Sequence, residues 1–181
     1  MHVRLDTPDD AEAIRAIYNV EVTTSTATFD LVPRTIEVQR DWLVARSGAH
    51  AVLVAVDGTG EVLAFGSLSP WRDRPAYSTT VEDSVYVRRD CHGQGVGRAI
   101  LTELVATATR HGFHACMARI VGGHEASIAL HSSCGFEVVG TFDPSIMQIQ
   151  SVTYAESALV DTLVPEFWGP SLSNDPAEPY F

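Results

Sequence analysis

The 181-residue sequence predicts a single domain of the mixed α/β class, and three observations support this prediction. Strand-like and helix-like patterns follow one another in the order βααβββαβαβ, with three consecutive strands in the middle. Neither an internal repeat nor a linker interrupts this order. Hydrophobic residues make up 45% of the chain and charged residues 19%, which is typical of a globular protein.

The N-terminal part of the chain predicts one strand and two helices. Residues 2–6 alternate in the manner of a short strand. Thr7 is a good helix N-cap and Pro8 favours the first helical position, so a helix should begin there and end before a polar loop at residues 23–30. A second helix is expected over residues 35–46.

The rest of the chain alternates between strands and helices. We expect a two-stranded hairpin at residues 51–69 and a further strand at 81–87. We then expect a helix at 97–111, a strand at 113–121, a helix at 124–135 and a strand at 136–142. Alternation over residues 146–154 predicts a final strand at an edge of the sheet. We expect the domain to cover residues 1–164, and residues 165–181, which hold four of the nine prolines, to form an acidic tail.

Charge and cysteine content exclude several classes of partner. The formal net charge of −11 repels nucleic acid and anionic membranes, so we expect neither as a partner. Three cysteines without a CxxC spacing argue against a disulfide framework and a structural zinc site. The N-terminus lacks the apolar core of a signal peptide, and we expect a cytoplasmic protein. His124 and His131 share a helix face but have no third ligand, so no metal is expected.

Three glycines, at positions 93, 95 and 97, separate the third central strand from the following helix. Such a turn suits phosphate binding, because the helix N-terminus has free N–H groups and glycine lets the backbone approach an anion. A P-loop is excluded, since the whole chain contains no lysine. The dinucleotide fingerprint GxGxxG fails as well, because its last position falls on Arg98.

The turn His92–Gly97 resembles the pyrophosphate-binding turn of the GCN5-related N-acetyltransferases (GNAT), although His92 stands where that family has Gln or Arg. The stretches STATF, TVEDSVYV and ASIALHSSCGF occur in the order found in the phosphinothricin acetyltransferase branch. The resemblance covers about three quarters of the chain. It implies a mixed, mostly antiparallel sheet that is splayed to admit coenzyme A.

The resemblance also implies which residues bind acetyl-CoA as cosubstrate. Backbone groups of the strand would hold the pantetheine arm, and the glycine turn would hold the pyrophosphate. His124 replaces an asparagine that contacts the cofactor in the branch. The implied cofactor-binding residues are Val85, Tyr86, Val87, His92, Gly93, Gln94, Gly95, Val96, Gly97, Arg98, His124 and Ser133.

Transfer of an acetyl group to an amine requires a base that removes the proton of the ammonium. Glu82 precedes the glycine turn on the strand where the thioester should lie, and it matches the glutamate that the family uses as base. His131 stands where many relatives have a tyrosine that protonates the thiolate; a packed structural histidine is the alternative.

The acceptor implied by the resemblance is a small amino acid or an analogue, acetylated on its α-amine. Phe29 and Tyr77 would wall its pocket, and Arg72 or Arg74 would bind its carboxylate; exposed surface arginines are the alternative. An acetyltransferase for another amine, or a non-catalytic acyl-CoA-binding module, also stays open. After Phe142 the chain departs from the branch, which puts the acceptor pocket and a homodimer in doubt.

Overall fold

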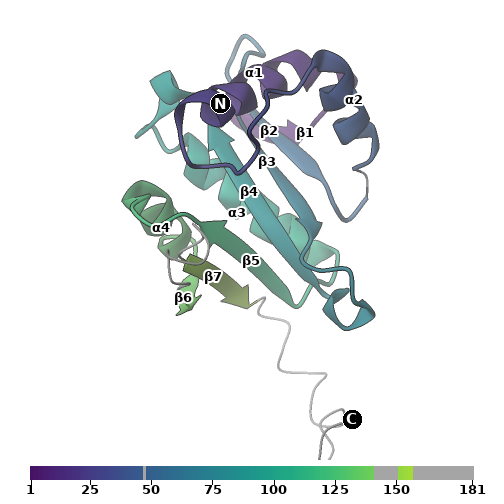
Figure 1. Ribbon diagram of the computed structural model, residues 1–181, viewed down its shortest axis with the longest axis vertical. Coiled ribbons are helices and arrows are strands. Elements are labelled where there is room, and N and C mark those ends of the chain that lie inside the picture. The colour runs from purple at the N-terminus through teal and green to yellow at the C-terminus, as the bar shows by residue number, and fades with distance from the viewer. Residues whose placement is uncertain (47, 141–150, 157–181) are drawn as a thin grey trace, which may run out of the picture.

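The computed structural model describes residues 1–46, 48–140 and 151–156, and for the last of these ranges the course of the backbone. They form a seven-stranded sheet in the order β1-β2-β3-β4-β5-β7-β6 (Figure 1). The pair β4–β5 is parallel, and all other neighbours are antiparallel. The strands are His2–Leu5 (β1), Val52–Val56 (β2), Val62–Pro70 (β3), Thr80–Val87 (β4), Ala115–Ile120 (β5), Glu137–Gly140 (β6) and Ser151–Glu156 (β7).

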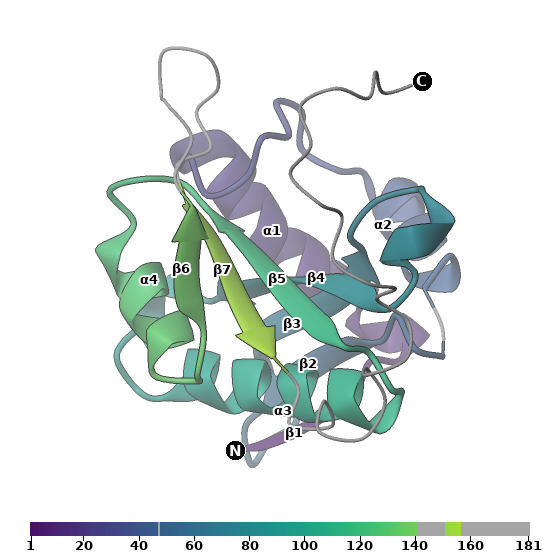
Figure 2. The same ribbon diagram turned by 90° about the horizontal axis from the view of Figure 1, so that it is seen from below.

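Helices cover both faces of the sheet (Figure 2). They are α1 (Ala11–Thr24), α2 (Ile36–Val44), α3 (Val96–Arg110) and α4 (Glu125–Ser132). One core lies under α1 and α2, where Ile14 and Tyr18 pack on Phe65. The other lies under α3, whose buried stripe includes Ile100 and Leu104, spaced as the helical period requires. In the described ranges, no helix has the length and apolar character needed to cross a bilayer.

The predicted class and order of elements are confirmed, with small shifts at the ends. Pro8 begins a short 3-10 turn, Pro8–Asp10, that leads into α1. The final strand was predicted at an edge of the sheet, and this is wrong: β7 lies between β5 and β6, so β6 forms the edge. Alternation reveals a strand but not its neighbours, which explains the error. The predicted tail and the domain boundary at residue 164 lie outside the described residues.

The two central strands separate halfway along their length. Backbone pairing between β4 and β5 covers residues 80–82 and 115–117. Beyond that point β4 continues to Val87, paired with β3 on its other side, and β5 continues to Ile120, paired with β7. Figure 1 shows the two strands diverging. The splayed sheet expected from the sequence is therefore present, and it leaves backbone groups of residues 83–87 facing an opening.

Candidate active site

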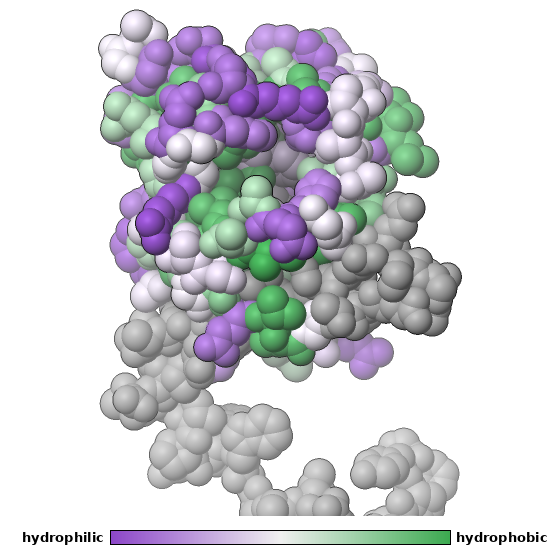
Figure 3. Space-filling model, turned by 90° about the vertical axis from the view of Figure 1, so that its left-hand side faces the viewer, coloured by the Kyte–Doolittle hydropathy of each residue, from purple (hydrophilic) through white to green (hydrophobic). Residues whose placement is uncertain are grey.

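A cleft of about 1160 Å³ opens where β4 and β5 separate. Its walls come from the loop after α1, from β4, from the glycine turn with the start of α3, from the end of β5, and from α4. Figure 3 views this side of the molecule, which is hollowed between its upper and lower parts. Hydrophobic and hydrophilic residues both border the hollow, so the cleft suits a ligand with apolar and charged parts.

The strand β4 lies along the cleft with Val85, Tyr86 and Val87 on its wall. The Tyr86 ring stacks on Phe65 at 5.1 Å between ring centroids. Burial raises the pKa of the Tyr86 phenol, so this side chain stays neutral. Because β5 pairs with β4 only as far as Glu82, the backbone groups of residues 83–87 on the β5 side are left to bind a ligand.

The glycine turn shapes the start of α3. Gly95 is the N-cap of this 15-residue helix and has φ = 79°, a conformation that glycine adopts without the strain imposed by a Cβ atom. A Cβ atom on Gly97 would lie 3.2 Å from Leu130 and 3.3 Å from Val87, so this glycine allows α3, α4 and β4 to approach closely. The first helical N–H groups lack acceptors within the helix, and they line the cleft, which fits a diphosphate.

The structure gathers most of the predicted cofactor-binding residues around the cleft. Two of them lie elsewhere: Gln94 Nε2 donates to the Asp90 carbonyl oxygen at 2.8 Å, and Ser133 Oγ donates to that of Leu130 at 2.7 Å. Neither Gln94 nor Ser133 lines the cleft. The predicted residues that do are Val85, Tyr86, Val87, His92, Gly93, Gly95, Val96, Gly97, Arg98 and His124.

Histidine and arginine contacts fix the rim of the cleft beside the glycine turn. His92 Nε2 donates to the Val87 carbonyl oxygen at 2.9 Å, and Arg98 Nη2 donates to that of Ser133 at 3.0 Å. His124 lies 3.0 Å from the Thr26 hydroxyl, and so connects α4 with the loop after α1. These side chains are held in place before any ligand arrives.

Glu82 lies in the cleft at the last paired position of β4, opposite Met117 of β5. Its carboxylate forms a two-pronged ion pair with Arg119, with Nε–Oε1 at 2.5 Å and Nη2–Oε2 at 2.9 Å. The Arg119 guanidinium also lies 5.8 Å from the Trp71 ring centroid. Arg119 is not among the predicted site residues, although an arginine within the apolar stretch ACMARIV marks this position.

Asp83, the next residue, points to the opposite face of β4 and is buried beside His131. His131 Nε2 lies 3.1 Å from Asp83 Oδ2, and His131 Nδ1 lies 2.7 Å from the Ser127 carbonyl oxygen. A carbonyl oxygen and a carboxylate both accept hydrogen bonds, so this arrangement favours the protonated, charged form of the ring. Burial lowers the pKa of His131, but the Asp83 carboxylate and the Ser127 carbonyl outweigh it and raise the pKa above its ordinary value.

His131 is buried but lines the cleft, and its catalytic role stays a prediction. Asp83 was not predicted as a site residue. Its signal was present, since it alternates with Val81 and Val85 on an apolar face, where a carboxylate requires a partner. Cys116 lies in the same cluster, with Sγ 3.9 Å from Asp83 Oδ1, and burial raises the pKa of its thiol.

Of the four residues predicted to bind the acceptor, the structure places one in the cleft and three outside it. Phe29 lines the cleft. Arg72, Arg74 and Tyr77 are exposed around the 3-10 turn Pro75–Tyr77 and do not line the cleft. Arg72 lies 5.2 Å from the centroid of Trp71, the same ring that Arg119 contacts, so the loop adjoins the Glu82 end of the cleft.

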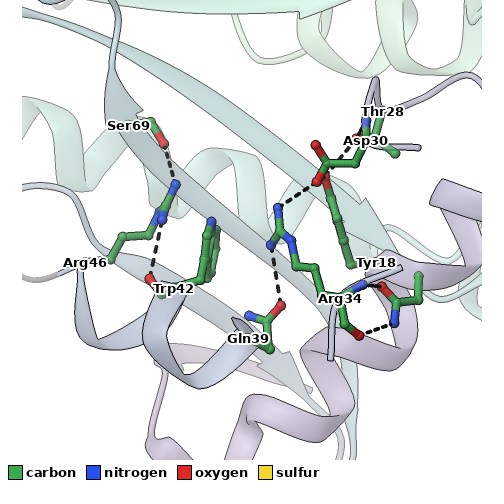
Figure 4. A network of polar contacts seen from close by, with 9 residues as sticks. Tyr18, Thr28, Asp30, Arg34, Gln39, Trp42, Arg46 and Ser69 are labelled. Carbon is green, nitrogen blue, oxygen red and sulfur yellow. Dashed lines mark hydrogen bonds and ion pairs between the residues drawn. The ribbon is translucent and has the colours of Figure 1, made fainter. Parts of the chain in front are cut away.

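A stack of arginines and aromatic rings supports the loop that carries Phe29 (Figure 4). Tyr18 donates its hydroxyl hydrogen to Asp30 at 2.6 Å, and the Arg34 guanidinium lies 3.8 Å from the Tyr18 ring centroid. Arg46 lies 3.8 Å from the Trp42 ring centroid. Burial, followed by the charge of Arg34, lowers the pKa of Arg46 to about 10. This stack fixes one wall of the cleft.

Acidic and histidine side chains do not assemble into a metal centre in the described part of the chain. No group of three or more His, Cys, Asp or Glu residues there could hold a metal ion. His124 and His131, the pair considered from the sequence, bond to different partners in the structure.

Comparison with known proteins gives one family. Residues 14–136 match the Acetyltransferase (GNAT) family. The chain is 40% identical over 132 residues to an L-methionine sulfoximine/L-methionine sulfone acetyltransferase of Pseudomonas paraeruginosa, and the match covers 72% of this chain and 77% of the relative.

Two solved structures share the fold over most of their length. A GNAT superfamily phosphinothricin acetyltransferase from Sinorhizobium meliloti, in complex with acetyl-CoA, matches with a TM-score of 0.78 and 31% identity over 85% of this chain and 86% of that chain. A ribosomal-protein-alanine N-acetyltransferase from Brucella melitensis matches with a TM-score of 0.81 and 32% identity over 87% of this chain and 100% of that chain. The chain therefore belongs to the GNAT family of N-acetyltransferases.

Proposed function

We propose that this protein transfers an acetyl group from acetyl-CoA to the α-amine of a small amino acid or an analogue of the methionine sulfoximine type. One observation carries the proposal: Glu82 lies in the same cleft as the start of α3, at the point where β4 and β5 separate. The cleft thus combines helix N–H groups, which suit a phosphate, with a carboxylate where the strands part. The names of the Pseudomonas and Sinorhizobium relatives support the choice of acceptor.

Residues of two elements would hold the cofactor. The first N–H groups of α3, from Val96 onward, would bind the pyrophosphate, and Arg98 would add positive charge. The backbone of β4 beyond Asp83 has no strand partner on the cleft side among the described residues, so it would pair with the pantetheine arm. Bound in this way, acetyl-CoA supplies the acetyl thioester that the amine attacks, with formation of the amide and release of the thiol.

Glu82 would act as the general base. Its carboxylate takes the proton that the acceptor ammonium must lose before the nitrogen is nucleophilic. A backbone N–H near Val85 or Val87 would donate to the acetyl oxygen as negative charge develops there. The role of His131 as an acid, a homodimer and a cytoplasmic location all stay predictions.

A second acceptor class has support from the Brucella neighbour, whose name gives a ribosomal-protein alanine as its acceptor. An exposed N-terminal alanine carries an α-amine like that of a free amino acid, but no adjacent carboxylate. The carboxylate is therefore the feature that separates the two acceptor classes.

Thiol release from acetyl-CoA tests the proposal with a panel of acceptors. We expect turnover above the acceptor-free background with L-methionine sulfoximine, L-methionine sulfone or L-phosphinothricin, and little turnover with polyamines or an alanine-initiated peptide. Turnover of the peptide alone would favour the second class. Tight binding of coenzyme A without turnover of any amine would favour a non-catalytic acyl-CoA-binding module.

A further inference from the structure

The candidate base, Glu82, forms an ion pair with Arg119 of the same chain. Arg119 lies two residues beyond the last paired position of β5, on the same face as Met117 and close to Glu82. The Glu82 side chain is 14% exposed, whereas that of Arg119 is 45% exposed. The guanidinium therefore covers the carboxylate and presents its own outer side to the cleft.

This pair obstructs an acceptor that carries only positive charge. An ammonium that approaches Glu82 meets the Arg119 guanidinium, and like charges repel strongly where water is partly excluded. Two of the Arg119 nitrogens already donate to Glu82, one to each carboxylate oxygen, and so neutralise its charge. Glu82 therefore receives the ammonium more favourably when another negative charge compensates Arg119.

An α-amino acid brings that compensation with it. Its carboxylate lies one carbon away from its ammonium, so the two charges of the zwitterion match the two charges of the Glu82–Arg119 pair. Arg119 Nη1 has no hydrogen-bond acceptor among the described residues, and a guanidinium binds a carboxylate through two parallel N–H groups. The Trp71 ring, 5.8 Å away, supports the guanidinium from the loop that also carries Arg72.

We propose that Arg119 binds the carboxylate of the acceptor and thereby releases Glu82 to the acceptor's ammonium. Arg119 is then the residue that selects a free α-amino acid over an amine or a peptide N-terminus. This inference rests on the proposed function, and it goes beyond it by naming the residue that determines specificity and by making the base available only when the correct acceptor is bound.

The test compares two acceptors that differ in the carboxylate alone, L-methionine sulfone and its carboxamide. For Arg119→Met we expect the KM for the acid to rise about 10- to 100-fold, the loss typical of hydrogen bonds to a charged group. The KM for the carboxamide should stay the same or fall, so the preference for the acid disappears. Arg119→Lys should lie between, because lysine keeps the charge but not the two-pronged geometry.

Arg110→Met is the matched control. Arg110 also pairs with a carboxylate, Glu103 at 2.8 Å, but on α3 and away from the cleft, so both acceptors should behave as with the unchanged protein. An unchanged affinity for acetyl-CoA in Arg119→Met would show that the proposed cofactor-binding part of the cleft is intact. An equal loss for acid and carboxamide, or an unchanged preference, would overturn the inference and leave the proposed function standing.

Calorimetric titration distinguishes a failure of the proposed function from a failure of the inference about Arg119. If the unchanged protein acetylates no amino acid, the proposed function is wrong. Titration of L-methionine sulfone in the presence of coenzyme A then still decides the role of Arg119: weaker binding to Arg119→Met than to Arg110→Met supports the carboxylate contact, and equal binding or none refutes it.

Discussion

Glu82 and Asp83 are neighbours in β4, yet their carboxylates lie on opposite faces of the sheet and in opposite surroundings. Residues of both pairs line the cleft, but Arg119 in the Glu82 pair is 45% exposed. In the Asp83 pair with His131, the two side chains are 1% and 5% exposed. An ion pair at a cleft can exchange partners with a ligand at little cost, whereas a buried one cannot separate without leaving a charge uncompensated. The Glu82–Arg119 pair is therefore suited to take part in the reaction, and the Asp83–His131 pair is suited to stabilise the fold.

The largest expected effect is on turnover. Glu82→Gln removes the base but keeps the shape of the side chain, so turnover should fall by about 10²- to 10⁴-fold. The affinity for acetyl-CoA should stay the same, because the α3 N-terminus is untouched. Thiol release and calorimetry measure the two quantities. Asp83→Asn is the matched change on the other face of β4. A larger loss of turnover in Asp83→Asn would mean that Asp83, and not Glu82, is the more important carboxylate for the reaction.

The next effect is on stability. Asp83→Leu leaves a buried imidazolium without its counter-charge, so the free energy of unfolding should fall by about 3–5 kcal/mol. Arg119→Met, which breaks the pair at the cleft, should cost less than about 1 kcal/mol. Urea unfolding measures both. The double variant Asp83→Leu/His131→Leu should recover part of the loss, and similar costs for the two single variants would show that the pairs are equivalent.

The buried pair also predicts how stability depends on pH. The pKa of His131 is raised in the folded state, so its contribution is fully present below the unfolded-state pKa of about 6.5 and is lost as the pH rises through the folded-state pKa. The stability difference between the unchanged protein and His131→Gln should therefore shrink as the pH rises above about 6.5. Urea unfolding at a series of pH values measures it, and a difference that grows would contradict a charged His131.

A smaller effect than that of Asp83→Leu is expected at Cys116, the third member of the buried cluster. Cys116→Ala removes a sulfur 3.9 Å from Asp83 but leaves the ion pair with His131, so we expect a loss of about 1 kcal/mol in the free energy of unfolding. Turnover should not change. A loss as large as that of Asp83→Leu would mean that the thiol, and not His131, is the main partner of Asp83.

Local patterns made much of the fold predictable from the sequence. Strands and helices follow from periodicity, Gly95 follows from the glycine turn before a helix, and Glu82 follows from the resemblance to the acetyltransferase family. Strand neighbours do not follow, because alternation is the same at an edge as inside a sheet; the position of β7 was mistaken for this reason.

The partners of the two carboxylates could not be predicted for a related reason. Arg119 is 37 residues from Glu82 in sequence, and His131 is 48 residues from Asp83. Both contacts depend on which residues of β4 and β5 lie side by side and on where α4 lies against the sheet. A buried acid and an arginine in an apolar strand signal that partners exist, but the register decides which they are.

The position of β7 has a consequence for synthesis of the chain. Among the residues that the structure describes, β6 joins the sheet through β7 alone, which follows it in sequence, and β7 also supplies the six partners along β5. A nascent chain released from the ribosome as far as Gly140 therefore holds two strands with unpaired edges. The sheet closes only when Ser151–Glu156 has emerged, so a premature stop codon before Ser151 should expose two adhesive edges and favour aggregation.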